Sequence, residues 1–279
     1  MLRTSVVIPA KDCRYLDGLI RALSNQSKKP DETVIVIKED EIGRNLHEVE
    51  TICSRYNLKC TVIGQQSGFF THALNIGKKT ANFDITIFTD SDAIPPSRWV
   101  ETYAKLYSRL PEKIGGISSR DIYWFEGKAT RTPDDMTQSQ LFRMLVRPFF
   151  QRPIKILRKY RLGLYLSKDM RALSGPFLPS RQCYSLPFRG VNMSFRSSAI
   201  ENIYFPDFQG IRIAPSNEVY LGLQLILRGQ DLIYVPNNPV FHLVHPSLSR
   251  QVDTQNLLFE KELMKTEFRR LLASFHINP

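Results

Sequence analysis

The sequence has no long hydrophobic run, and no window approaches the roughly 18 consecutive apolar residues that a membrane-spanning helix needs. The strand-like run at residues 5–8 is too short for the core of a secretion signal. The four cysteines lack CxxC spacing, which indicates neither a zinc knuckle nor a disulfide framework. We therefore expect a soluble, unexported protein from a reducing compartment.

Common phosphate- and calcium-binding motifs are also missing. No GxGxxG follows an expected strand, and residues 77–80 lack the upstream glycine and the residue order of a P-loop. Asp90, Asp92 and Glu101 match three positions of an EF-hand, but Pro95 stands where that loop requires glycine. These absences argue against an ATP cradle, an ordinary dinucleotide site and an EF-hand.

The composition is that of a folded protein with a concentrated positive charge. Of the 279 residues, 42% are hydrophobic, which is enough for a packed core. The net charge is +11, and residues 143–171 contain nine basic residues against one acid. Such a patch can face phosphate, lipid headgroups or nucleic acid. A solvated helix face with apolar side-chain stems is the bland alternative and is favoured over a lipid surface. Nucleic acid is the least favoured partner because no nucleic-acid-binding module accompanies the charge.

Strand and helix patterns alternate through the first ninety residues. Apolar runs predict strands at residues 4–8, 34–37, 60–63 and 85–89, with amphipathic helices between them, the third ending at Gly77 as a C-cap. This order predicts an α/β fold with a doubly wound, mainly parallel sheet, whose ligands bind beyond the carboxyl ends of the strands.

The pattern is less regular beyond residue 95. It predicts helices at 99–110, 218–228 and 257–275, and strands at 114–118, 190–195 and 232–235. Residues 120–187 have little periodicity, and we expect loops and short helices there, laid over the sheet.

Two aspartates follow the fourth expected strand. Asp90 and Asp92, two residues apart, point to the same side of an extended backbone. Two carboxylates suit Mg²⁺ or Mn²⁺ holding a diphosphate. A solvated turn capped by aspartate is the alternative, but a place at the carboxyl end of a central strand favours the metal site.

Several segments resemble, in order and spacing, the glycosyltransferases of family 2 with the GT-A fold. The upstream segments are Ser5-Val6-Val7-Ile8-Pro9-Ala10-Lys11-Asp12, Lys38-Glu39-Asp40, Ala73-Leu74-Asn75-Ile76-Gly77 and Thr89-Asp90-Ser91-Asp92. Downstream, the segment 190–196 resembles the family's G-x-N-x-x-F-R strand, Asn217-Glu218 stands at its Glu-Asp pair, and Val240-Phe241-His242 resembles its V-x-H. The resemblance covers about residues 4–245, with little support from 120 to 187.

The resemblance implies a GT-A-type sheet with an acceptor-side subdomain. Residues 1–100 would form the nucleotide-sugar-binding half, and residues 101–250 the acceptor-binding half, with the basic insert 143–171. Beyond the resemblance, the apolar spacing at 257–275 predicts a C-terminal amphipathic helix within residues 251–279, docked on the core, with a dimer or membrane face as the alternative.

The resemblance also implies roles for the matching residues. Asp90, Asp92 and His242 would bind Mn²⁺ or Mg²⁺, and Glu218 would be the catalytic base that deprotonates the acceptor hydroxyl. Without the resemblance, the simplest interpretation of Glu218 is an acid that complements the dipole at a helix N-terminus. Two departures stand out, because Lys38-Glu39 stands where the family usually carries Asp-Asp, and Asn217 replaces the first acid of its later pair. The implied substrate-binding residues are Pro9, Lys11, Glu39, Asn75, Asp90 and Asn192.

The expected function is metal-dependent transfer of a sugar, with inversion, from a UDP- or GDP-sugar to a hydroxyl of a glycan or lipid-linked acceptor. The alternative is a non-catalytic module on the same fold that binds a membrane or nucleic acid through the basic stretch. We expect a cytoplasmic protein, with a peripheral place on the cytoplasmic face of a membrane if residues 143–171 contact anionic lipid.

Overall fold

The computed structural model describes residues 2–39, 43–130, 151–175, 177–244 and 254–277. Its centre is an eight-stranded sheet with the order β11-β13-β6-β12-β4-β1-β2-β3. Most neighbouring strands are parallel, but β12 runs antiparallel to β4 and β6, and β11 runs antiparallel to β13. The strands are β1 (Thr4–Ala10), β2 (Glu32–Lys38), β3 (Cys60–Gln65), β4 (Ile85–Phe88), β6 (Ile114–Ser118), β11 (Cys183–Tyr184), β12 (Met193–Arg196) and β13 (Asp231–Tyr234).

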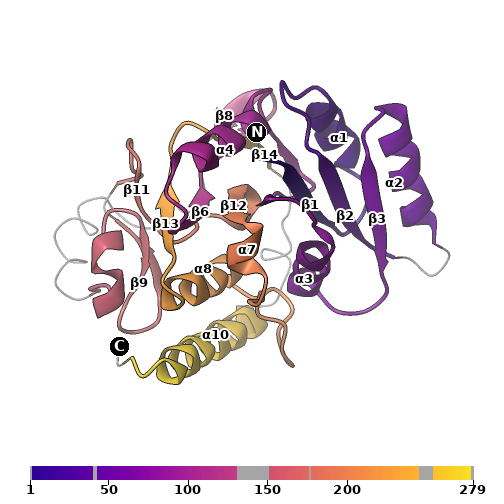
Figure 1. Ribbon diagram of the computed structural model, residues 1–279. Helices are drawn as coiled ribbons and strands as arrows, with labels where there is room; N and C mark the ends of the chain where they lie inside the picture. Colours follow the sequence, from indigo (N-terminus) through magenta and orange to yellow (C-terminus); the bar gives the residue numbers. More distant parts are fainter. Residues whose placement is uncertain (1, 40–42, 131–150, 176, 245–253, 278–279) are drawn as a thin grey trace.

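Helices cover both faces of this sheet (Figure 1). Alternate residues of β1 serve the two layers, since Val6 and Ile8 pack into one core cluster and Val7 into the other. The helices of the first layer are α1 (Leu16–Ser24), α2 (Arg44–Arg55) and α4 (Trp99–Arg109). Those of the second layer are α3 (Phe70–Thr80), α7 (Ser197–Ile200) and α8 (Asn217–Leu227).

The C-terminal helix α10 (Thr254–Ser274) lies beneath α8 in Figure 1, on the side away from the sheet. Met264, Phe268 and Leu272 are buried in the core cluster of the second layer. The ring of Phe268 lies 5.8 Å from that of Tyr220 on α8. These contacts agree with the core docking expected for this helix.

The described part of the chain also contains two smaller sheets. The four-stranded one has the order β5-β14-β7-β8, and the two-stranded one pairs β9 with β10. The strands are β5 (Ala93–Ile94), β7 (Asp121–Phe125), β8 (Lys128–Thr130), β9 (Leu164–Leu166), β10 (Ala172–Ser174) and β14 (Val240–Leu243). Two 3₁₀ helices, η2 (Lys155–Tyr160) and η3 (Gly190–Asn192), lie before β9 and β12.

The predicted α/β class with a mainly parallel sheet is confirmed, and three local expectations are corrected. Residues 120–187 contain β7 to β11 instead of only loops and short helices. Helix α3 continues past Gly77 to Thr80, because Gly77 does not have the positive φ of a C-cap glycine and instead packs against Val7 of β1. Cys53 and Cys60 form a disulfide that joins α2 to β3, whereas the sequence indicated no disulfide framework, so the cysteines no longer support the expected reducing compartment.

Strands from residues 1–100 and 101–250 share the one large sheet, and the three-part division made from the sequence stays a prediction. Residues 143–150 of the basic insert lie outside the described part of the chain. Among the helices that the structure describes, none has both the length and the apolar character to cross a membrane.

Candidate active site

Polar side chains gather where the central strands end. β1, β2 and β4 are mutually parallel, and β6 shares their direction because both β4 and β6 run antiparallel to β12. Their carboxyl ends therefore lie along one edge of the sheet, which is the edge where α/β folds bind ligands. Asp90 follows β4 there, and Asp121 follows β6.

The small sheet brings His242 to this edge. On β14, His242 pairs with Ala93 of β5 on one side and with Tyr123 of β7 on the other. Asp92 immediately precedes β5, and Asp121 begins β7. The strand register thus places the imidazole between two carboxylates that are far apart in sequence.

The distances show a compact cluster. His242 Nε2 lies 3.3 Å from Asp92 Oδ2, and His242 Nδ1 lies 3.0 Å from Asp121 Oδ2. One ligand atom from each of Asp90, Asp92 and His242 lies within 4.8 Å of the others. Arg189 Nε lies 3.8 Å from Asp121 Oδ1, on the far side of that carboxylate.

The surroundings shift the pKa values of these groups. Burial lowers the pKa of His242, but hydrogen bonds to Asp121 and Asp92 together with the charges of Asp92 and Asp90 outweigh it and raise the pKa to about 10. Burial raises the pKa of Asp121, yet the hydrogen bond from His242 and the charge of Arg189 bring it below its usual value. The carboxylates on either side therefore favour the protonated form of the His242 imidazole.

Asp90 and Glu218 have raised pKa values. Burial and the charge of Asp92 raise the pKa of Asp90 to about 7, with smaller contributions from Asp121 and Glu218. Burial also raises the pKa of Glu218, against the opposing charge of Arg189. Burial thus favours the neutral form of both carboxyl groups, and the negative charges of the neighbouring acids add to this effect at Asp90.

The donor set fits a divalent cation. Two carboxylates and an imidazole converge from β4, β5 and β14, and carboxylate oxygens are preferred ligands of Mg²⁺ and Mn²⁺. Asp121 hydrogen-bonds the second ring nitrogen of His242, an arrangement that fixes the ring of a metal-ligating histidine. A bound cation would take the place of the proton on His242 Nε2 and offset the repulsion between Asp90 and Asp92.

Glu218 lies in the first turn of α8, after a tight loop. Ala214 and Ser216 in this loop have φ values of 51° and 65°, in the left-handed region. The neighbouring Asn217, which stands where the family has an acid, donates from Nδ2 to the carbonyl oxygen of Ala214 at 3.0 Å. Asn217 therefore holds the loop, and Glu218 is the carboxylate of the pair.

The expected nucleoside-binding residues also lie at the shared sheet edge. Pro9 is in the last part of β1, and the exposed Lys11 follows that strand. Glu39 follows β2, and its backbone N–H donates to the carbonyl oxygen of Gln65. Its carboxylate occupies the space where a side chain at Gly64 would lie. The three residues border the same edge as Asp90, and their contacts with a nucleoside stay predictions.

Asn192 and Asn75 have protein partners for their amides. Asn192 Oδ1 accepts hydrogen bonds from Trp99 and Tyr103 at 3.0 and 2.7 Å, and its Nδ2 donates to the carbonyl oxygens of Arg120 and Asn238. Because Arg120 precedes Asp121, Asn192 holds the backbone beside the cluster of Asp90, Asp92 and His242. The Asn75 amide makes two hydrogen bonds with the Phe205 backbone. Both asparagines position the fold around the site, and their contact with substrate stays a prediction.

Sequence reasoning missed Asp121 and Arg189. Asp121 contacts His242 and Arg189 contacts Asp121, but residues 120–187 lacked the periodicity that would mark a strand near Asp121. Asp121 could have been found from its position, because it stands three residues after the end of β6. Asp90 stands in the same way two residues after the end of β4.

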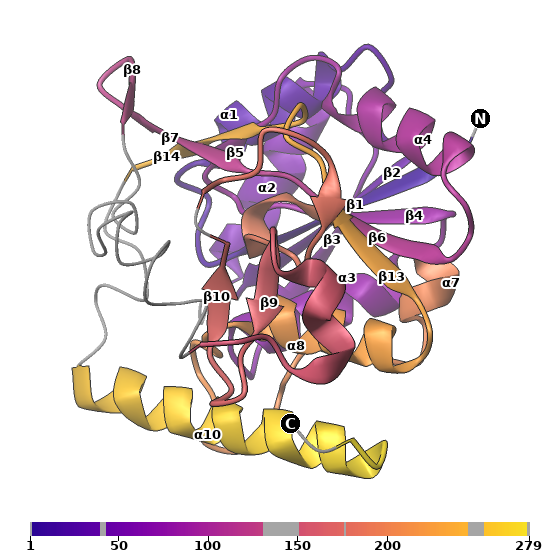
Figure 2. The ribbon, with the colours of Figure 1, turned by 90° about the vertical axis from the view of Figure 1, so that its left-hand side faces the viewer.

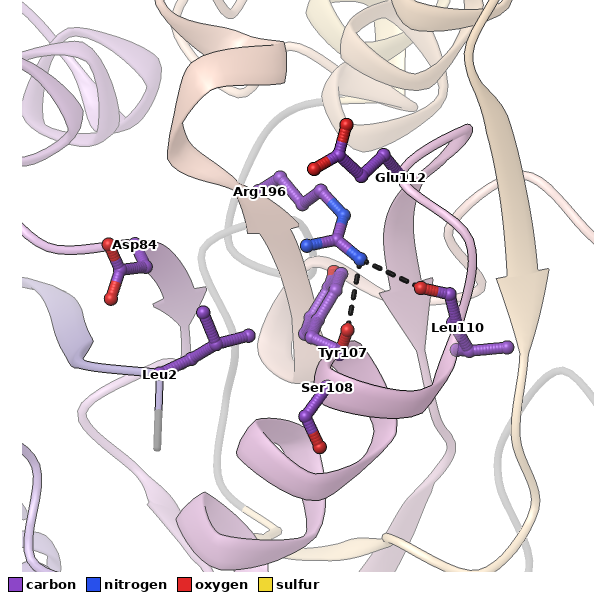
Figure 3. Close-up of a pocket in the computed structure, with 7 residues that line it drawn as sticks. All are labelled: Leu2, Asp84, Tyr107, Ser108, Leu110, Glu112 and Arg196. Carbon is purple, nitrogen blue, oxygen red and sulfur yellow. Dashed lines mark hydrogen bonds between the residues drawn. The ribbon is translucent and has the colours of Figure 1, made fainter.

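A separate pocket of about 530 Å³ lies away from this cluster (Figure 3). Leu2 and Asp84 in its lining precede β1 and β4, so it borders the amino ends of these strands, opposite to Asp90. Arg196 in the pocket donates to the carbonyl oxygens of Tyr107 and Leu110 at 3.0 and 3.1 Å. Arg196 thus tethers the end of α4, and the pocket is not part of the cluster.

The comparisons agree with this geometry. Residues 5–166 match the model of the family described as glycosyl transferase family 2. No curated protein sequence matches the chain. Among solved structures, residues 1–349 of TarS from S. aureus in complex with UDP align with a TM-score of 0.58 and 14% identity, over 98% of this chain and 70% of that one.

Two further structures share the fold. The mannosyltransferase PcManGT from Pyrobaculum calidifontis, in complex with GDP-Man and Mn²⁺, aligns with a TM-score of 0.53 and 15% identity, over 88% of this chain and 58% of its own. GalNAc-T7 with UDP, GalNAc and Mn²⁺ aligns with a TM-score of 0.66 and 12% identity, over 99% of this chain and 55% of its own. At such identities the likeness extends to the fold alone.

Proposed function

Because this chain belongs to glycosyl transferase family 2, we propose that it transfers a sugar from a UDP- or GDP-sugar to a hydroxyl group, with a divalent cation bound by Asp90, Asp92 and His242. The observation that carries the proposal is the convergence of these three ligands at the carboxyl edge of the sheet, where the charge of Glu218 also contributes to the raised pKa of Asp90. Nucleotides or nucleotide sugars in structures of the same fold support this donor class.

Each residue has a defined part in the proposed reaction. The cation, Mn²⁺ or Mg²⁺, would act as a Lewis acid that stabilises the negative charge on the departing diphosphate. Glu218 takes the proton of the acceptor hydroxyl, whose oxygen forms the new bond to the anomeric carbon as the bond to the diphosphate oxygen breaks. A single displacement of this kind inverts the anomeric carbon. The raised pKa of Glu218 makes it a stronger base than an ordinary carboxylate.

The acceptor in this proposal is a glycan or a lipid-linked glycan, and the protein works at the cytoplasmic face of a membrane. Within the described part of the basic insert, Lys155, Arg158 and Arg161 are exposed. Leu162 is 59% exposed beside them. Exposed cations with an apolar side chain among them suit an anionic lipid surface. The family membership favours this enzyme over the non-catalytic module.

The test combines a binding screen with two variants. The melting temperature is measured with UDP-GlcNAc and GDP-mannose, with Mn²⁺, Mg²⁺ or EDTA, because a ligand that binds the native state raises it. We expect a donor-induced rise that requires the cation and disappears in Asp92→Asn. Glu218→Gln should keep this rise but lower release of the nucleoside diphosphate by about 10²- to 10⁴-fold.

Asp84→Asn is the matched control, since Asp84 lies at the opposite end of β4 and should behave as the unchanged protein. A donor-induced rise that persists in EDTA would refute the cation requirement. Unimpaired turnover in Glu218→Gln would remove Glu218 from the role of base.

A further inference from the structure

The C-terminal helix contains a buried carboxylate that its docking does not explain. Glu260 on α10 is only 3% exposed. Apolar contacts from Met264, Phe268 and Leu272 already dock the helix. A buried charge is costly unless it is hydrogen-bonded, so the partners of Glu260 indicate its role.

Those partners are three consecutive backbone N–H groups in the loop before α8. Glu260 Oε1 accepts from Arg212 at 3.1 Å, and Oε2 accepts from Ile213 and Ala214, both at 2.9 Å. This loop is irregular, so its N–H groups need a partner from elsewhere in the chain. A charged acceptor makes such hydrogen bonds stronger than a neutral one would.

The same loop leads directly to Glu218. The carbonyl oxygen of Ala214 accepts hydrogen bonds from both the backbone N–H and the side-chain Nδ2 of Asn217, each at 3.0 Å. Ala214 is held in the left-handed region, with φ at 51°. A continuous series of hydrogen bonds therefore runs from α10 through Ala214 and Asn217 to the residue that carries the proposed base.

We propose that Glu260 is a positioning residue for catalysis, which fixes the loop 212–217 so that the carboxylate of Glu218 faces the acceptor hydroxyl. This inference rests on the proposed role of Glu218 as base. It assigns a function to α10, which lies beyond residues 5–166 matched by the family model. A small displacement of a reacting group is enough to lower turnover while substrate binding persists.

The experiment measures release of the nucleoside diphosphate from UDP-GlcNAc or GDP-mannose, whichever the binding screen selects, with Mn²⁺ and water as the acceptor. Glu260→Gln keeps one oxygen acceptor, whereas Glu260→Met removes both at a similar side-chain length. We expect kcat to fall by about 10-fold in Glu260→Gln and about 100-fold in Glu260→Met, with the donor KM within about twofold of its original value. Glu262→Gln is the control, because Glu262 is an exposed acid on the same helix.

The double variant Glu218→Gln with Glu260→Gln separates positioning from general stability. If Glu260 acts through Glu218, the second substitution adds no further loss of kcat to the first. Additive losses, or an unchanged kcat in Glu260→Gln, overturn the inference. Full turnover in Glu218→Gln alone instead overturns the proposed base, which is a distinguishable result. This comparison uses only the Gln variants and remains decisive if Glu260→Met does not fold.

Discussion

His242 is held between carboxylates on both sides, and only one of these is a predicted metal ligand. Asp121 bonds the ring nitrogen that faces away from Asp92. Asp121→Asn removes the negative charge that makes the imidazole a stronger ligand, so we expect Mn²⁺ to bind about 10- to 100-fold more weakly. The measurement is a Mn²⁺ titration followed by the melting temperature. Equal Mn²⁺ midpoints in Asp121→Asn and the Asp84→Asn control would contradict this role.

The three proposed metal ligands could be picked out from the sequence, whereas the residues that hold them in place could not. Asp90, Asp92 and His242 stand in recognisable segments, and the structure brings them together. Asp121 approaches His242 only through the register of β14 with β7, a pairing of residues more than a hundred positions apart. Asn192 matched a segment of the family, but its hydrogen bonds to Trp99 and Tyr103 depend on how α4 packs.

Helix α3 packs on the sheet at a glycine. A Cβ at Gly77 would lie 2.3 Å from Val7 Cγ1, on the fully buried strand β1. In an exposed helix, Gly→Ala stabilises by about 1 kcal/mol, but overpacking a core costs about 1–3 kcal/mol. Steric overlap therefore dominates, and we expect Gly77→Ala to lower the free energy of unfolding by about 1–2 kcal/mol.

Gly18 in α1 provides the matched comparison. A Cβ there would meet only the end of the Ile94 side chain, at 3.2 Å, which can move. Urea denaturation should show a much smaller effect, of either sign, for Gly18→Ala. If the two alanine variants unfold at the same urea concentration, steric overlap with Val7 is not the reason for a glycine at position 77.

The elements with strong local patterns were predictable, and those that depend on distant partners were not. The buried runs of β1, β2 and β4 have continuous apolar residues, which is typical of strands covered on both faces. β5 has only two residues, and β7 lies in a region without periodicity. Pairing with β14 stabilises both, and no local pattern specifies that partner.

Some basic residues of the molecule form ion pairs within the fold, and others are exposed and can contact a partner. Lys159 of the basic insert forms an ion pair with Asp231, and Tyr160 donates to the same carboxylate. These contacts fix η2 beside β13, so Lys159 serves the fold. Arg158 and Arg161 are exposed on the same segment, next to β9, which faces the viewer in Figure 2. They remain the candidates for contact with anionic lipid.

Vesicle binding tests this surface. Each basic residue near an anionic membrane contributes about 1 kcal/mol, so reversing two charges with Arg158→Glu and Arg161→Glu should weaken binding to phosphatidylglycerol vesicles by at least about 30-fold. The control carries the same change of charge elsewhere, with Lys29→Glu and Lys59→Glu, where Lys59 precedes β3 at the other edge of the sheet. Co-sedimentation at increasing salt gives both affinities, and binding should fall as salt screens the charges. Equal losses in the two double variants would indicate a general charge effect. Binding of the unchanged protein to phosphatidylcholine vesicles as strong as to phosphatidylglycerol vesicles would exclude an electrostatic contact. Either result contradicts a membrane-facing role for residues 151–171.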